Sequence, residues 1–186
     1  MIQPVAAQVD FFALFSLSAA FDLDAARLQQ PYQDLQRAFH PDRFVQRSAT
    51  ERRLSLEQVT HLNRAYQTVK DPLLRSEYLL ERSGQGGAID EKALNREPAF
   101  LMEVMEQREA LEEVEITDPQ AMQRLQSLRR EADQRIAQEL AALRALHGAT
   151  AVDWQAVARC NHRLRYQRRF LEAMDQVEEQ LWQQDG

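Results

Sequence analysis

The sequence predicts an all-α protein made of two helical parts. Its 186 residues include only 5 glycines and 6 prolines, and the frequent leucine, alanine, glutamate, glutamine and arginine residues favour helices. Apolar residues recur at helical spacing on both sides of "SGQGGAIDEKALNRE", a stretch that holds three of the five glycines and loses this spacing. We therefore expect an N-terminal helical hairpin with short flanking helices over residues 1–82, a linker over residues 83–97 and a C-terminal three-helix bundle over residues 98–186.

The N-terminal part opens with "VDFFALFSL", which predicts a short apolar helix. A second helix is expected in "FDLDAARLQQPYQDLQRAFH", where Asp24 stands at the N-cap position. Pro31 interrupts this helix, so that it either kinks there or has its regular part begin at Pro31. The apolar side chains at helical spacing in this segment are Leu28, Tyr32, Leu35 and Phe39.

The tripeptide His40-Pro41-Asp42 ends the second helix, because a residue that precedes proline is pushed out of the helical region. A further helix is expected from about Ser48 to Lys70. It ends at Asp71-Pro72, where "PLLRSEYLLERS" begins the next helix. One face of the long helix carries Ser55, Val59, Leu62, Tyr66 and Val69.

Three long helical patterns follow the expected linker. The first runs roughly from Pro98 to Glu115, and the second opens at Asp118-Pro119. The third follows Gly148, with Thr150 and Asp153 at the spacing of a capping box. The apolar stripe of the second pattern consists of Met122, Leu125, Leu128, Ala132, Ile136, Leu140 and Leu143, and that of the third consists of Val157, Cys160, Leu164, Leu171, Met174 and Leu181.

Composition excludes several classes of function. The net charge of -6 argues against binding of a nucleic-acid backbone, which needs a basic surface. A single cysteine, Cys160, excludes a disulfide framework and a zinc or iron–sulfur site of paired cysteines. The four histidines show no metal-ligand spacing, so we expect no metal and no cofactor. The chain shows neither a signal-peptide pattern nor a membrane-length apolar run, so we expect a cytoplasmic protein, for which a monomer needs no further assumption.

The tripeptide itself does not suggest catalysis. His40 and Asp42 have no activated serine or cysteine that the sequence places beside them, and no glycine-rich turn that would hold an oxyanion or a phosphate. A chance turn is the simplest alternative, since average residue usage produces this tripeptide in roughly one chain of this length in a hundred.

The surrounding residues resemble a J-domain. A short apolar helix, a helix ending "DLQRAFHPDRF" and a helix continuing into "LNRAYQTVKDPLLRSEYLL" cover residues 8–82. The resemblance implies that the tripeptide lies between two antiparallel helices, docks on a heat-shock ATPase of the DnaK class and stimulates its ATP hydrolysis. The chain would then not be an enzyme, because the chemistry occurs in the partner.

The resemblance also assigns residues to the chaperone-binding surface. His40, Pro41 and Asp42 match the stimulatory tripeptide, and the residues beside it that would present the basic docking face are Gln36, Arg37 and Arg43. This face is weak, because Asp34 stands between Arg27 and Arg37 in the second helix, which suggests a specialised partner. Phe39 and Phe44 are expected to pack the loop onto the core.

The second half extends the resemblance. No Gly/Phe-rich stretch, Cys-rich zinc module or membrane anchor follows the J-domain; the sequence continues with an acidic helical bundle that opens "EPAFLMEVMEQREALEEVE". This combination resembles the HscB type of J-protein over nearly the whole chain. It implies that an HscA-type chaperone binds the J-domain and that the bundle holds the IscU-type scaffold on which iron–sulfur clusters are built. Without an N-terminal four-cysteine module or transit peptide, a bacterial member is expected.

One stripe of the first bundle helix is the expected scaffold-binding face. Its members fall at i, i+3, i+4, i+7 and i+11 and are Met102, Met105, Glu106, Glu109 and Glu113, with Leu101 at the border. On spacing alone the stripe is equally a solvated edge, and the core face would be Phe100, Val104 and Leu111. The resemblance favours binding, because the stripe and Leu101 match the family's scaffold-binding patch.

Two residues of the last helix complete the expectations. Tyr166 is turned about 200° from the apolar stripe in a regular helix, on the side of His162 and Phe170. The resemblance adds it to the scaffold-binding patch, whereas packing under the linker or the J-domain is the alternative. Cys160 is expected to be a small buried hydrophobe. Three other functions stay open: a J-protein for another client, a helical hydrolase that uses Cys160, and a structural adaptor with an accidental tripeptide.

Overall fold

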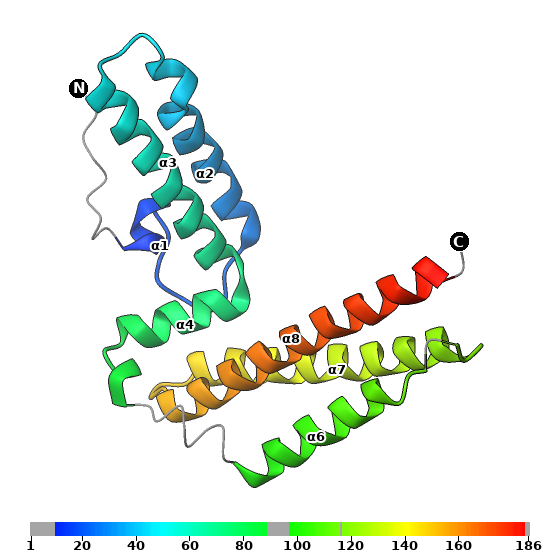
Figure 1. Ribbon diagram of the computed structural model, residues 1–186. Coiled ribbons are helices and arrows are strands. Elements are labelled where there is room, and N and C mark those ends of the chain that lie inside the picture. Colours follow the sequence, from blue (N-terminus) through cyan, green and yellow to red (C-terminus); the bar gives the residue numbers. More distant parts are fainter. Residues whose placement is uncertain (1–9, 89–96, 116, 185–186) are drawn as a thin grey trace. The chain divides into compact units, whose positions relative to one another are not determined.

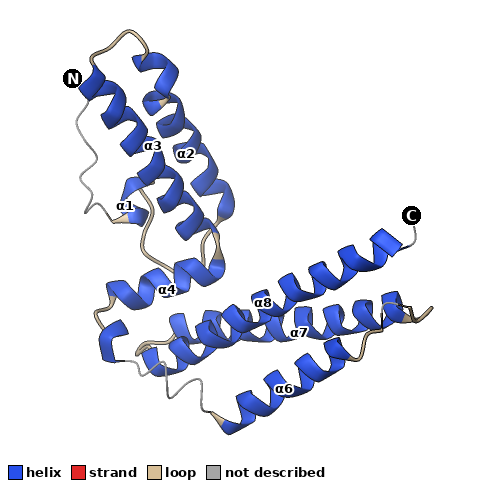
Figure 2. Cartoon of the chain, in the orientation of Figure 1, coloured by secondary structure: helices blue, strands red, loops and turns tan. Residues whose placement is uncertain are grey.

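The computed structural model describes residues 10–88, 97–115 and 117–184 of the chain, and all its regular elements within these ranges are helices (Figures 1 and 2). The chain forms two compact units that divide after Arg82. Residues 1–9, which include Val9 of the expected first helix, lie outside the described residues, as do residues 89–96 of the expected linker.

The N-terminal unit is a helical hairpin with a short helix on either side. Its elements are α1 (Phe11–Leu14), α2 (Ala25–Phe39), the 3₁₀ turn η1 (Pro41–Phe44), α3 (Ala49–Lys70) and α4 (Pro72–Arg82). Figure 1 shows α2 and α3 side by side, with η1 in the loop that joins them. The expectation of a hairpin with short flanking helices is confirmed.

Side-chain caps fix where these helices begin. Asp24 accepts a hydrogen bond from the Ala26 N–H at 2.9 Å, which confirms it as the N-cap of α2. Ser48 and Glu51 form a reciprocal capping box at the start of α3, and these hydrogen bonds from Ser48 lower the pKa of the Glu51 carboxyl. Each cap satisfies backbone donors that the first helical turn leaves without a partner.

Pro31 lies inside α2, which is continuous from Ala25 to Phe39. The alternative that the regular part begins at Pro31 is therefore wrong. A proline in a helix interior removes one backbone donor. Packing offsets this loss, because Leu28 is buried and the neighbouring Tyr32 ring stacks on Tyr66 of α3 with ring centres 3.8 Å apart.

Aromatic side chains hold the N-terminal unit together at the other end of the hairpin. Phe12 and Phe15 are almost fully buried, and the Phe11 ring stacks on Tyr78 of α4 with centres 4.6 Å apart. The Tyr78 hydroxyl also accepts a hydrogen bond from the Phe11 N–H at 3.0 Å. The core of α3 contributes Ser55, Leu62, Ala65, Tyr66 and Val69, whereas Val59 is half-buried.

The C-terminal unit is a three-helix bundle of α6 (Pro98–Glu112), α7 (Ala121–His147) and α8 (Trp154–Gln184). The long helices α7 and α8 pack along each other and α6 lies beside them (Figure 1). Two of these helices are shorter at one end than the sequence suggested: α6 stops before Glu113, and α7 begins at Ala121 rather than at Asp118. The main buried cluster of this unit is Val114, Ala121, Leu125, Ala132, Phe170, Met174 and Leu181.

The start of α8 differs from the expected capping box. Asp153, not Thr150, is the residue at the helix boundary, and its carboxylate accepts a hydrogen bond from the Ala156 N–H at 3.0 Å. The helix therefore begins three residues later than a Thr150 cap would require. Both residue types cap helices well, and their spacing alone does not decide which of them does so.

Candidate functional site

The HPD loop, defined as residues 39–47, presents its tripeptide to solvent. The His40 Nδ1 accepts a hydrogen bond from the Asp42 N–H at 3.3 Å, so that a neutral imidazole carries its proton on Nε2. The side chains of His40 and Asp42 are 53% and 85% exposed. A hydrogen bond within the tripeptide thus restricts its conformation, while its imidazole and carboxylate remain accessible to a partner.

Both ends of the HPD loop are fastened to α3. The buried Ser55 hydroxyl donates to the Phe39 carbonyl at 2.7 Å, where α2 ends. At the other end the Arg52 guanidinium donates to the carbonyls of Val45 and Arg47, each at 3.3 Å. Phe39 and Phe44, on either side of the tripeptide, are half-buried. These contacts restrict the loop and leave its polar tip exposed.

The residues expected beside the tripeptide have different environments. Arg37 is exposed, with its guanidinium 3.5 Å from the Asp34 carboxylate. Arg43 donates to the Arg37 carbonyl at 3.3 Å and so lies next to it. Gln36 is half-buried and donates to the Tyr32 hydroxyl at 3.2 Å, which turns it towards the hairpin. Arg37 and Arg43 therefore form the basic part of this surface, and Gln36 supports the hairpin.

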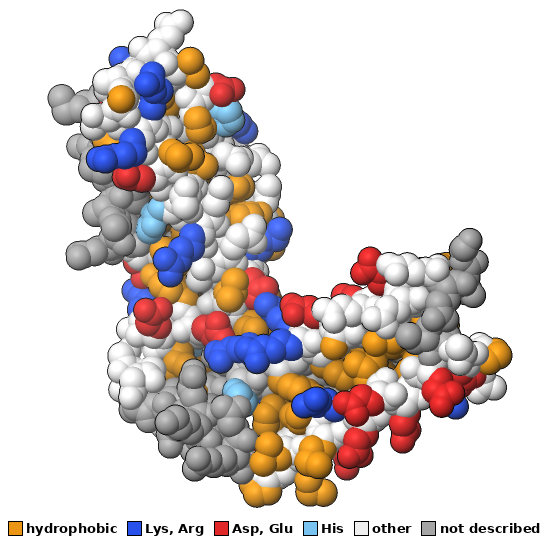
Figure 3. Space-filling model, in the orientation of Figure 1, with side chains coloured by type: hydrophobic (Ala, Val, Ile, Leu, Met, Phe, Trp, Pro, Cys, Tyr) orange, Lys and Arg blue, Asp and Glu red, His pale blue; other side chains and the backbone are white. Residues whose placement is uncertain are grey.

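The α6 stripe, defined as Leu101, Met102, Met105, Glu106, Glu109 and Glu113, is exposed along its whole length. Leu101, Met102 and Met105 are 42%, 63% and 59% exposed, although large apolar side chains are usually buried. Figure 3 shows hydrophobic side chains followed by acidic ones along α6. An apolar patch that continues into an acidic one is typical of a surface that binds another protein.

The three glutamates of the α6 stripe differ from the other acidic residues of this helix. Glu103 forms an ion pair with Arg135 of α7 at 2.9 Å, and Glu112 lies 3.9 Å from Arg108. Within the described part of the chain, Glu106, Glu109 and Glu113 have no ion-pair partner, so their charges are available to a basic partner surface. The core-facing side of α6 instead contains Phe100, Val104, Gln107 and Leu111.

A buried polar contact joins α6 to α8. Gln107 and Gln167 donate to each other's side-chain oxygens at 3.2 and 3.1 Å, and both residues are buried. Beside them the Tyr166 hydroxyl donates to the Val104 carbonyl at 3.2 Å. Burial raises the pKa of the Tyr166 phenol, which keeps the hydroxyl protonated as a donor.

The structure changes the expected surroundings of Tyr166. This side of α8 is not turned away from the core: Phe170 is buried in the bundle, and Tyr166 is half-buried with its ring edge-on to Phe100, 5.6 Å between centres. The reason is that α8 packs against two neighbours, α7 and α6, so that its buried surface is wider than one stripe. Tyr166 therefore packs against α6 of its own bundle.

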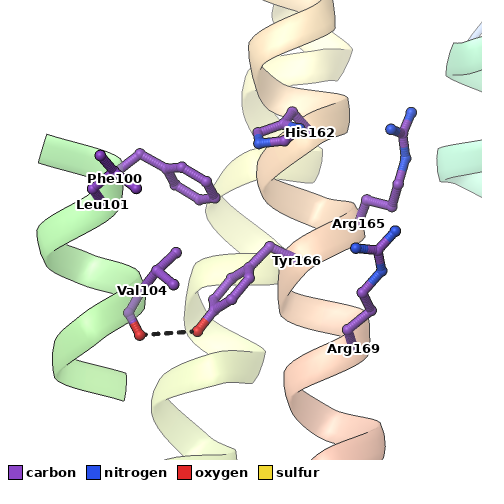
Figure 4. A pocket seen from close by; sticks show the side chains of 7 residues that line it. All are labelled: Phe100, Leu101, Val104, His162, Arg165, Tyr166 and Arg169. Atoms are coloured by element: carbon purple, nitrogen blue, oxygen red, sulfur yellow. Dashed lines mark hydrogen bonds between the residues drawn. The ribbon is translucent and has the colours of Figure 1, made fainter. Parts of the chain in front are cut away.

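Two adjoining cavities open between α6 and α8. The first has a volume of about 300 Å³ and is lined by Phe100, Leu101 and Val104 of α6, and by Tyr166 and Arg169 of α8 among others (Figure 4). The second, of about 320 Å³, shares Tyr166 and Arg169 with the first. Leu101 thus connects the α6 stripe with Tyr166. The family resemblance assigned both to one patch, and the cavity lining gives the geometric reason.

Comparisons with known proteins identify the family of this chain. The family described as the HSCB C-terminal oligomerisation domain matches residues 96–175. The co-chaperone protein HscB homolog of Cupriavidus taiwanensis is 42% identical over 74% of this chain and 76% of its own length. The HscB homolog of Mannheimia succiniciproducens is 35% identical over 91% of this chain and 96% of its own. The chain belongs to the HscB family of co-chaperones.

Solved HscB structures share the fold of both units. Chaperone HscB from Vibrio cholerae aligns over 93% of this chain and 99% of its own with a TM-score of 0.79 and 34% identity. The human co-chaperone protein HscB aligns over 95% of this chain and 86% of its own with a TM-score of 0.83 and 29% identity. The fold of this HscB-type chain is therefore an N-terminal J-domain followed by a helical bundle.

Several residues around the two surfaces of this HscB-type chain were missed by the sequence analysis. Ser55 was assigned to a core face without its hydrogen bond to the loop, and Gln107 and Gln167 were not considered. A glutamine at a core position of a predicted helix was the signal available for Gln107, since it follows Phe100 and Val104 at helical spacing. Arg169 belongs to the basic run "RLRYQRR", whose position over the cavities only the packing of α8 on α6 defines.

Cys160 is half-buried rather than a buried member of the core stripe. The pKa of its thiol is raised to about 12, mainly by burial and to a smaller extent by a hydrogen bond with Glu139. The thiol is therefore protonated at neutral pH and is a poor nucleophile. Within the described ranges, no group of three or more His, Cys, Asp and Glu residues is arranged to hold a metal ion, and no helix has the length and hydropathy to cross a membrane.

Proposed function

We propose that this HscB-type co-chaperone binds an IscU-type iron–sulfur scaffold through the α6 stripe and Tyr166, and delivers it to an HscA-type chaperone whose ATPase it stimulates through the HPD loop. The observation that carries the proposal is the exposure of three large apolar side chains, Leu101, Met102 and Met105, in line with glutamates that have no ion-pair partner among the described residues.

The chemistry of the α6 stripe defines the partner surface that would fit it. Methionine side chains are unbranched and adapt to irregular apolar surfaces. Glu106, Glu109 and Glu113 favour basic groups next to that apolar area, and they would speed association at low salt. We therefore propose that the scaffold presents apolar side chains bordered by lysines or arginines to α6.

The HPD loop supplies the second binding surface. Exposed His40 and Asp42, with Arg37 and Arg43 beside them, offer one donor, one carboxylate and two guanidinium groups to the chaperone. With both partners bound to one chain, client and ATPase are held at a high effective concentration. The protein itself then catalyses no reaction, and it would act in the cytoplasm, where we place both partners.

The first experiment measures ATP turnover by the HscA-type chaperone with and without the IscU-type scaffold. We expect the protein to stimulate turnover, the scaffold to increase the stimulation, and His40→Gln to abolish it in a protein that folds normally. The doubly substituted Met102→Ser, Met105→Ser protein should keep the scaffold-independent stimulation and lose the increase. Trp182→Ser is the matched control, because Trp182 is an equally exposed apolar side chain of the same bundle.

The outcomes separate the two halves of the proposal. Stimulation that does not depend on the scaffold would support the chaperone partner and would indicate that the bundle binds another client. No stimulation by the folded wild-type protein would contradict the role of the HPD loop. Light scattering of the free protein should accompany these assays, because the matching family domain is named for oligomerisation and we propose a monomer.

A further inference from the structure

The groove between α6 and α8 combines an apolar floor with a basic wall. Phe100 and Val104 of α6 and Tyr166 of α8 line the first cavity, and Phe170, which is buried in the core, lines the second. Arg169 lines both cavities. Figure 4 shows Tyr166 between the two helices, whereas the side chain of Arg169 extends from the other side of α8 in this view. Arg169 is the charged side chain common to both cavities, whereas Arg165 lines the first alone, and Arg108 and Glu112 line the second alone.

Arg169 differs from the arginines that stabilise the bundle. Arg163 pairs with Glu97 at 3.3 Å and with Glu139 at 3.6 Å, and Arg129 pairs with Glu178 at 3.1 Å. Arg169 is exposed, and within the described part of the chain it has neither an ion pair nor a hydrogen bond from its side chain. Its charge therefore contributes nothing to holding the helices together and remains available to a ligand.

Arg165 adds a second positive charge to the lining of the first cavity. Arg165 and Arg169 are four residues apart on α8 and both line the first cavity. Like charges at this spacing repel each other across one helical turn. Arg165 has a further interaction within the chain, so Arg169 is the guanidinium that would offer a carboxylate its planar fork.

The acidic side of α6 limits which anion fits. The α6 stripe carries three glutamates that have no ion-pair partner in the described ranges, and it borders the same groove through Leu101. A polyanion such as nucleic acid, or an anionic membrane surface, would be repelled by these carboxylates, and the net charge of -6 adds to the repulsion. A protein surface with charges of both signs satisfies both sides of the groove.

We propose that Arg169 is a specificity-determining residue of the scaffold-binding surface. The partner inserts an apolar side chain between α6 and α8 against Phe100 and Tyr166, and an aspartate or glutamate next to that side chain in the partner pairs with Arg169. This inference rests on the proposed function and extends it. It requires the scaffold to present a basic region to the α6 stripe and an acidic residue to α8, which fixes the orientation of the complex.

The test measures the affinity of the IscU-type scaffold for the full-length protein by isothermal titration calorimetry. Arg169→Glu reverses the charge without touching the core and should weaken binding about tenfold, while Arg169→Lys keeps the charge and should bind within about threefold of wild type. Arg130→Glu is the matched control. It makes the same change of charge at an exposed site on α7 that lines neither cavity, and it should bind like wild type.

A second set of variants identifies the partner carboxylate. Each exposed aspartate and glutamate of the scaffold is replaced by lysine, and one of these variants should restore binding to Arg169→Glu while weakening binding to wild type. Wild-type affinity in Arg169→Glu, or an equal loss in Arg130→Glu, would overturn the inference and leave the proposed function intact. Absence of scaffold binding by the wild-type protein would overturn both.

Discussion

Gln107 and Gln167 form a reciprocal pair of amide hydrogen bonds in the buried interface of α6 and α8, at 3.2 and 3.1 Å. Two primary amides can satisfy each other in this way only when they lie edge to edge in nearly one plane, because their N–H bonds and carbonyl lone pairs lie in the amide plane. The pair therefore fixes the rotation of α6 about its axis. With Gln107 turned inwards, the α6 stripe must face solvent, because its residues lie on the other side of the helix.

Replacement of one glutamine should cost more than replacement of both. Gln107→Ala leaves the Gln167 amide buried, with its nearest remaining partner the Glu103 carboxylate at 3.5 Å, and should lower the free energy of unfolding by about 1–3 kcal/mol. The double Gln107→Leu, Gln167→Leu protein should lose less. Urea unfolding followed by tryptophan fluorescence measures this, since Trp154 and Trp182 both lie in α8. Gln126→Ala, at an exposed site on α7, should change little.

Variants at Tyr166 test whether its hydroxyl group or its aromatic ring contributes to scaffold binding. Tyr166→Phe removes the hydrogen bond to the Val104 carbonyl but keeps the ring against Phe100, so that it should lower stability by about 1 kcal/mol and retain most of the scaffold affinity. Tyr166→Ala removes the wall shared by both cavities and should weaken scaffold binding much more. Calorimetric titration with the scaffold checks this order. Equal binding by Tyr166→Ala and wild type would exclude Tyr166 from the scaffold-binding surface.

Ser55 links the core of the J-domain to the HPD loop. Ser55→Ala leaves the Phe39 carbonyl without this donor and should lower stability by about 1–2 kcal/mol. It should also reduce chaperone stimulation, because the loop end is less restricted. Thr60→Ala is the control. The Thr60 hydroxyl also bonds a carbonyl of α3, that of Leu56 at 2.9 Å, but at an exposed site away from the loop. Normal stimulation by Ser55→Ala would show that the loop does not need this anchor.

Cys160 should be chemically inert in the folded protein. With a pKa of about 12, only about one thiol in ten thousand is ionised at pH 8, so iodoacetamide should react far more slowly with native than with guanidinium-unfolded protein. The raised pKa favours the neutral thiol in the folded state. Its contribution to stability is therefore complete below the pKa of the unfolded thiol and decreases as the pH rises above it.

A variant separates the causes of this shift. Glu139→Gln removes the carboxylate next to the thiol but keeps its burial, so the thiol pKa should fall only in part and native alkylation should accelerate modestly. Rapid alkylation of the native wild-type protein at pH 8 would contradict the described environment of Cys160 and would revive the alternative of a thiol hydrolase.

Local sequence patterns predicted most of the fold. Helix existence followed from apolar periodicity, and Asp24, Pro41 and Pro72 marked boundaries correctly, because caps and prolines act through the backbone within one or two residues. The α6 stripe was also predicted as one continuous face, since helical geometry alone brings i, i+3 and i+4 together. Residue spacing alone did not predict whether that face is exposed, because the burial of a helix face depends on what packs against it.

The sequence by itself thus determined which residues share a helix face and which tripeptide ends α2. Tertiary structure decided the rest. It turned Gln107 inwards to meet Gln167, buried Phe170 on the side of α8 that lies away from the predicted apolar stripe, and set Tyr166 and Arg169 at one groove. These residues lie about 60 positions apart from their α6 partners, and no local period encodes such contacts. They arise because α8 has to cover two neighbouring helices at once, and only the packed bundle shows which side chains then meet.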